Sequence, residues 1–84
     1  MYKVYVLKSL HKNFHYIGHS GNLPERFTEH NQGKVRSTKA YRPFRIIYTE
    51  RYATKSEAVK REYYLKSAAG NIWLRTYLKS RGRW

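Results

Sequence analysis

The sequence contains no cysteine, only five acidic residues among 84, and no long apolar run. Without cysteine the chain has neither a disulfide framework nor a thiolate zinc site. No apolar segment approaches the ~18 residues that a membrane-spanning helix needs, and no signal-peptide core follows Met1. These absences favour a cytoplasmic protein without a membrane partner.

The scarcity of acids leaves a large surplus of positive charge, with 18 Lys and Arg and a net charge of +13. A short chain with this surplus repels itself unless an anionic partner is near, and nucleic acid is the commonest such partner. A membrane surface is the competing partner, but it would need one helix with a wide apolar face and a basic back. The basic residues run from Lys3 to Arg83 instead, so nucleic acid is favoured.

The residues that are abundant indicate a folded chain. Hydrophobic residues make up 40% of the sequence and include nine Tyr, three Phe and two Trp, whereas disordered chains are poor in aromatic residues. The length predicts one domain over residues 1–80. We expect the basic tail, 81–84, to fray.

Local patterns predict the elements of this domain. Segments 2–8, 14–18 and 44–50 are typical of strands, the first two forming a hairpin. Two capping boxes, at 22–25 and 54–57, predict helices that end at Gly33 and Gly70. A last helix is expected over 71–80, with Asn71 as its N-cap. The order β-β-α-β-α-α predicts an α+β domain in which helices flank a small, three-stranded, mostly antiparallel sheet.

Among the acids, Glu62 is the candidate for chemistry. Ala58, Glu62, Leu65 and Ala69 form one stripe on the second helix, and a carboxylate in an apolar stripe needs a partner. That partner is either a basic side chain, giving a salt bridge, or a metal ion. Mg²⁺ is typically held by one carboxylate, water and a substrate phosphate.

Two further pairs are candidates. Arg26 and His30, four residues apart on the first helix, share a face that is either simply solvated or a phosphate site with a proton carrier. Tyr5 and Tyr16 lie on adjacent strands, as a cross-strand aromatic pair or as reactive tyrosines. Surrounding positive charge would lower a tyrosine pKa from about 10 and favour a general base.

The joint order of these residues is more specific than any one pair. Tyr5, then Tyr16-Ile17-Gly18, then Arg26 and His30, and a lone Glu62 on a later helix resemble the GIY-YIG nuclease family over residues 2–70. The second half-motif matches fully, whereas Lys3-Val4-Tyr5 replaces Gly-Ile-Tyr in the first. The stretches NLPERFTEHNQG and SEAVKREYYLKS are similar to helices of small, single-domain members.

The resemblance implies a metal-dependent DNA endonuclease. Tyr5 would act as the general base or position the attacking water, and Tyr16 would orient that water or the scissile phosphate. Arg26 would neutralise charge on the phosphoryl oxygens, and His30 would carry the tyrosine's proton or bind phosphate. Glu62 would hold one Mg²⁺ or Mn²⁺, with no small-molecule cofactor. Gly18 would make room for a phosphate or another backbone segment.

No residues remain for a separate DNA-binding domain, so we expect cutting of low sequence specificity. A basic loop with Tyr41 and Phe44 would hold the DNA backbone or stack on unpaired bases; its cations are Lys34, Arg36, Lys39, Arg42 and Arg45. Branched or single-stranded DNA, in repair or recombination, would suit such a surface. The alternatives are a non-catalytic nucleic-acid-binding module on the same fold and a basic ribonucleoprotein component. The roles of His19 and Ser20, and the oligomeric state, stay open.

Overall fold

The computed structural model describes all residues 1–84 and contains one three-stranded antiparallel sheet. Its strands are β1 (Tyr2–Ser9), β2 (His15–Ser20) and β3 (Phe44–Tyr52), in the order β2-β1-β3. The central strand β1 is buried on both faces from Val4 to Leu7, as its apolar sequence predicts. Tyr5 of β1 stands opposite Gly18 of β2 and Thr49 of β3. The register therefore brings the two predicted tyrosine motifs together.

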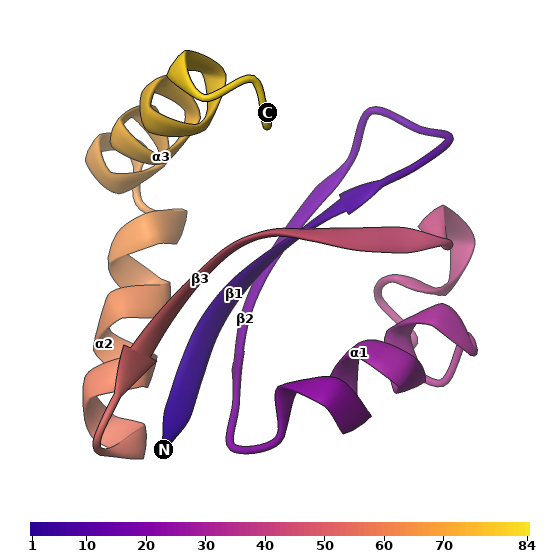
Figure 1. Cartoon of the computed structure of the whole chain (residues 1–84), viewed down its shortest axis with the longest axis horizontal. Coiled ribbons are helices and arrows are strands. Elements are labelled where there is room, and N and C mark those ends of the chain that lie inside the picture. Colours follow the sequence, from indigo (N-terminus) through magenta and orange to yellow (C-terminus); the bar gives the residue numbers. More distant parts are fainter.

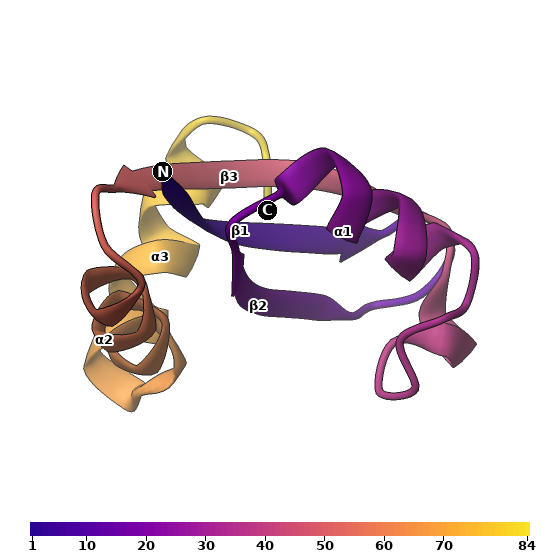
Figure 2. The same cartoon turned by 90° about the horizontal axis from the view of Figure 1, so that it is seen from below.

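The helices cover the two faces of the sheet, as Figures 1 and 2 show. Helix α1 (Leu23–Asn31) follows β2, and a short 3-10 helix, η1 (Lys39–Tyr41), lies in the loop before β3. Helices α2 (Lys55–Lys66) and α3 (Ala68–Ser80) pack on the opposite side of the sheet. The predicted order β-β-α-β-α-α and the α+β class are confirmed. No helix is long and apolar enough to cross a membrane.

Strand alternation divides the core into two clusters. Val4, Val6 and Ile17 face α2 and α3, where they pack with apolar residues of those helices. Tyr5 and Leu7 face the other way, toward α1. The fully buried side chains on the α2–α3 side are therefore all aliphatic, with tyrosines and Trp84 packed around them, whereas those on the α1 side include Tyr5 and Phe44.

The junction of α2 and α3 differs from the prediction. We expected the second helix to continue to Gly70, but it ends at Lys66, and Ser67 rather than Asn71 caps α3 by accepting a hydrogen bond from the amide of Gly70. Gly70 lies so close to α2 that a Cβ there would stand 1.9 Å from the carbonyl oxygen of Tyr64. This glycine is therefore needed for close helix packing and not for a C-cap.

The C-terminal tail is packed in the structure, where we had expected it to fray. The indole of Trp84 stacks on the imidazole of His15 with ring centroids 3.7 Å apart. The Lys8 ammonium donates a hydrogen bond to the carbonyl oxygen of Trp84 at 2.6 Å. An aromatic residue in a basic tail can bury its ring, which composition alone does not indicate.

Candidate active site

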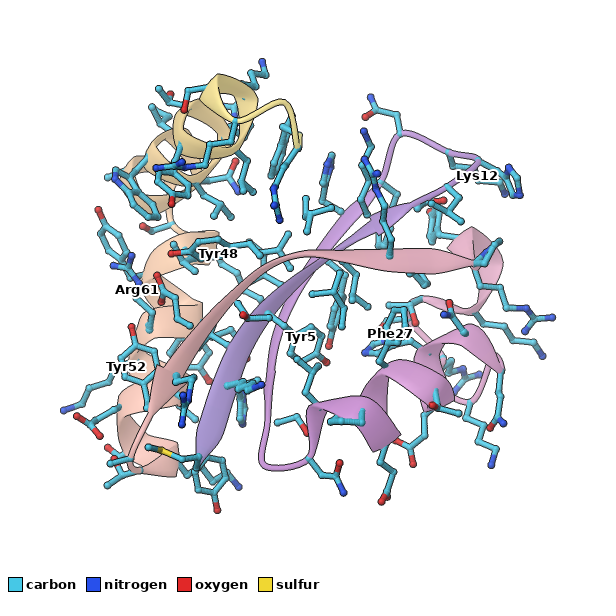
Figure 3. The ribbon with its side chains drawn as sticks, in the orientation of Figure 1. Tyr5, Lys12, Phe27, Tyr48, Tyr52 and Arg61 are labelled. Atoms are coloured by element: carbon cyan, nitrogen blue, oxygen red, sulfur yellow. The ribbon has the colours of Figure 1, made fainter.

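The two candidate tyrosines lie together on the α1 face of the sheet. Tyr5 is 1% exposed, and its ring centroid is 6.2 Å from that of Tyr16. Figure 3 shows Tyr5 between the sheet and α1, on the same side as Phe27. Antiparallel pairing of β1 and β2 produces this arrangement, because Tyr5 and Tyr16 have the same side-chain direction on neighbouring strands.

Gly18 makes the tyrosine arrangement possible. A Cβ at this position would stand 2.8 Å from Cε2 of Tyr16 and 2.8 Å from Oη of Tyr5. Both distances are shorter than real Cβ contacts allow. We expected Gly18 to leave space for a phosphate or a backbone segment; in the structure the two tyrosine rings fill that space. β2 also continues beyond Gly18 to Ser20.

Helix α1 adds the arginine and the histidine. The side chain of His30 is completely buried, and its Nε2 lies 2.9 Å from Oη of Tyr5. The His30 ring centroid is 4.9 Å from that of Tyr16. The guanidinium of Arg26, one helical turn earlier, is close enough to Tyr5 to affect its pKa, and it pairs with Glu29 at 3.2 Å. Two strands and one helix therefore bring four of the five candidate catalytic residues into contact.

Burial perturbs the proton equilibria of this cluster. Desolvation, reinforced by Tyr16, raises the pKa of Tyr5 to about 12 in spite of the nearby Arg26 guanidinium. The expectation of a lowered tyrosine pKa is therefore wrong for Tyr5. Desolvation, with a smaller contribution from Arg26, lowers the pKa of His30 to about 4. At neutral pH the cluster contains a protonated tyrosine beside a neutral imidazole.

The fifth residue, Glu62, reaches the sheet from the α2 side. It is 8% exposed and buried in the same stripe as Ala58 and Leu65, as predicted, whereas Ala69, which we expected in this stripe, is exposed and belongs to α3. Its Oε1 lies 2.6 Å from Nδ1 of His19, and its Oε2 accepts a hydrogen bond from the Lys66 ammonium at 2.7 Å. Burial opposes ionisation, but the hydrogen bonds from Lys66 and His19 outweigh it and lower the carboxyl pKa. Glu62 is therefore ionised at neutral pH.

Glu62 stands apart from the other four residues but is electrostatically linked to them. Its charge contributes to the raised pKa of Tyr5, and Lys66 lies 6.0 Å above the ring of Tyr16. No group of three or more His, Asp or Glu side chains gathers there or elsewhere in the structure. One ionised carboxylate fits Mg²⁺ or Mn²⁺ if water and substrate phosphate complete the coordination shell.

The basic loop between α1 and β3 has an exposed and a buried part. The five candidate DNA-binding cations are all exposed, and none forms an ion pair. Lys34, Arg36, Lys39 and Arg42 lie in this loop, whereas Arg45 lies in β3. Tyr41 stacks on Phe14 with ring centroids 3.9 Å apart. This stack holds the loop against the β1–β2 hairpin.

The buried part of the loop contains a residue that sequence reasoning missed. Thr38 is completely buried, and its Oγ1 lies 2.9 Å from Nδ1 of His30. The contacts of His19 and Lys66 with Glu62 were missed as well. Strand alternation gives a signal for His19, because it places this residue on the opposite face from Tyr16; helical spacing gives one for Lys66, four residues after Glu62.

Fold and site together define a class of protein: a small α+β domain with two strand tyrosines, an arginine and a histidine on one face of a three-stranded sheet. The chain belongs to the GIY-YIG family, a family of nucleases, because the model of the GIY-YIG catalytic domain matches residues 1–77. The resemblance noted from the sequence is thereby confirmed.

Its relatives include UPF0213 proteins. One from Staphylococcus aureus is 40% identical over 65 residues, which cover 76% of this chain and 78% of that protein. One from Staphylococcus epidermidis is 45% identical over 53 residues, which cover 62% of this chain and 65%, just under two thirds, of that protein. The solution NMR structure of the UPF0213 protein BH0048 from Bacillus halodurans is 28% identical. The structural match covers 90% of this chain and 83% of the BH0048 chain, with a TM-score of 0.54.

Proposed function

We propose that this chain is an endonuclease that hydrolyses phosphodiester bonds of DNA with one Mg²⁺ or Mn²⁺ and little sequence specificity. The observation that carries the proposal is the 2.9 Å contact between Oη of Tyr5 and Nε2 of His30. A buried tyrosine with a pKa of about 12 does not ionise by itself near neutral pH. A neutral imidazole at its hydroxyl supplies a proton acceptor.

The other site residues take roles that fit their positions. Arg26, whose charge acts on Tyr5, would neutralise charge that develops on the phosphoryl oxygens. Tyr16, beside both Tyr5 and His30, would orient water or phosphate. Glu62 would hold the metal ion, which when bound supplies positive charge at the leaving oxygen. When the metal ion binds, the Lys66 ammonium would separate from the Glu62 carboxylate and remain near the phosphate.

The basic loop supports DNA as the partner. Four of its five exposed and unpaired cations lie on the loop whose Thr38 contacts His30, and Arg45 follows at the start of β3, so phosphates held there would be near the tyrosines. These contacts involve the DNA backbone and carry no base information. Branched or single-stranded DNA would present its phosphates to these cations. The stacking of unpaired bases on Tyr41 and Phe44, which we expected from the sequence, is wrong, because Phe44 is buried in the core and Tyr41 is stacked on Phe14.

One observation favours a second candidate, a non-catalytic nucleic-acid-binding module. The Lys66 ammonium already neutralises Glu62 at 2.7 Å. If this ion pair persists when DNA is bound, the carboxylate never receives a metal ion. The two candidates therefore differ in their response to divalent metal and to the loss of Glu62.

The test is cleavage of supercoiled, single-stranded and branched DNA with Mg²⁺, Mn²⁺ or EDTA. We expect metal-dependent cutting that is lost in Tyr5→Phe and Glu62→Gln. The matched controls are Tyr63→Phe and Glu57→Gln, which change an exposed tyrosine and a capping glutamate of α2; both should remain active. Cutting that survives Tyr5→Phe or Glu62→Gln would refute the proposed site. DNA binding in EDTA without cutting of any substrate would support the binding module.

A further inference from the structure

Thr38 connects the tyrosine–histidine pair to the backbone of the basic loop. Its Oγ1 is 2.9 Å from Nδ1 of His30 and also 3.3 Å from the carbonyl oxygen of Val35. His30 and Thr38 are both completely buried, so water does not substitute for these partners. We propose that Thr38 is a positioning residue that fixes His30 in the tautomer with the proton on Nδ1, which leaves Nε2 free to accept the proton of Tyr5.

The hydrogen-bond partners permit this assignment at every atom. The hydroxyl of Thr38 donates to the carbonyl of Val35, and its oxygen then accepts a hydrogen bond from Nδ1–H of His30. A neutral imidazole carries one N–H, so Nε2 is an acceptor. It receives the O–H of Tyr5. Each donor in this chain has an acceptor.

The opposite tautomer leaves one buried donor without an acceptor. If Nε2 carried the proton, Nε2–H of His30 would donate to the oxygen of Tyr5. The hydroxyl proton of Tyr5 would then have no acceptor, because this hydroxyl has no other hydrogen-bond partner and the nearby Arg26 guanidinium has no acceptor atom. The hydroxyl of Thr38 would also turn from the carbonyl of Val35 to Nδ1. A buried donor without an acceptor is destabilising, so this tautomer is disfavoured.

The tautomer sets the direction of proton transfer, and this consequence rests on the proposed function. As the attacking water bonds to phosphorus, one of its protons moves to the oxygen of Tyr5 and the tyrosine proton moves to Nε2 of His30. The bond from phosphorus to the leaving oxygen breaks, and that oxygen takes a proton from solvent. Thr38 continues to accept from Nδ1–H of the imidazolium, which later returns its extra proton to solvent through Tyr5.

The test is NMR of uniformly ¹⁵N-labelled protein, in which long-range ¹⁵N–¹H spectra distinguish protonated from bare ring nitrogens. We expect the His30 ring of the wild type to carry its proton on Nδ1, and Thr38→Ser to retain that pattern. In the isosteric Thr38→Val variant Nδ1–H loses its acceptor, and we expect the proton to move to Nε2. We expect kcat for DNA cleavage to fall ~100-fold in Thr38→Val, with KM changed less than twofold, and to be restored in Thr38→Ser.

The spectra do not require an active enzyme, so this inference and the proposed function fail separately. A wild-type His30 that carries its proton on Nε2 would overturn the inference even if the protein cuts DNA. A Thr38→Val protein that keeps the Nδ1–H form and the wild-type kcat would overturn it as well. If Thr38→Val does not fold, the wild-type and Thr38→Ser spectra still decide the tautomer. An Nδ1–H His30 in a protein that cuts no DNA would support the tautomer and refute the nuclease.

Discussion

Burial of His30 should make the stability of the protein depend on pH between 5 and 7.5. The pKa of His30 is lowered to about 4 in the folded state, whereas an unfolded chain has a histidine pKa of about 6.5. As the pH falls below 6.5 the unfolded state binds the proton first, so the free energy of unfolding decreases. Over this range a shift of that size corresponds to a loss of about 2 kcal/mol, which is a large part of the stability of a small domain.

The measurement is urea unfolding at pH 7.5, 6 and 5, compared between the wild type and His30→Gln. Burial also lowers the pKa of His15, so the wild-type pH dependence has a second contributor and the difference between the two proteins is the informative quantity. The carboxyl groups of Glu50 and Glu62 have pKa values lowered from 4.5, and they titrate below this range. His11→Gln, at an exposed position in the β1–β2 turn, is the matched control. Equal pH dependence in wild type and His30→Gln would refute the lowered pKa.

Three further predictions concern packing, an ion pair and DNA binding. Gly18→Ala should lower the free energy of unfolding by about 1–3 kcal/mol in thermal melts and displace both tyrosines; Gly21→Ala, whose Cβ would stand 3.2 Å from Cε2 of Tyr2, should change it less. Glu50→Gln should cost about 2 kcal/mol in urea unfolding, because Glu50 accepts hydrogen bonds from two tyrosines and from Arg61; the same loss in an Arg61→Met background would contradict this. Alanine at Lys34, Arg36 and Lys39 together should weaken DNA binding and reduce the salt slope by about 3 in titrations at several salt concentrations, and an unchanged slope would exclude the loop from the interface.

The fold and most of the site were predictable because they depend on local patterns. Strand alternation places Tyr5 and Tyr16 on one face of the sheet. Helical spacing places Arg26 and His30 on one face of α1, and that helix face packs toward the two tyrosines. The apolar stripe correctly identified Glu62 as a buried carboxylate. Each of these inferences uses residues that are close in sequence and have a fixed period.

Contacts between distant segments, in contrast, had no periodic signal. Thr38 lies in an irregular loop, and nothing in the order of its neighbours indicates that its hydroxyl meets a histidine eight residues earlier. The raised pKa of Tyr5 depends on desolvation that only the assembled core provides. The break at Ser67 follows from the packing of Gly70 against the carbonyl of Tyr64, and a glycine after a helical pattern is equally typical of a C-cap.

The edge strand β2 explains how one short motif serves both halves of the site. Tyr16 and Gly18 point to α1 and the buried Tyr5, whereas Ile17 and His19 point to α2, where His19 meets Glu62. A slip of β2 by one residue would exchange the two faces and place Tyr16 beside the carboxylate. Gly18 opposes such a slip, because its position opposite Tyr5 is the one at which a side chain does not fit. Gly18 therefore fixes the register of β2. The proposed chemistry on both faces of the sheet depends on this register.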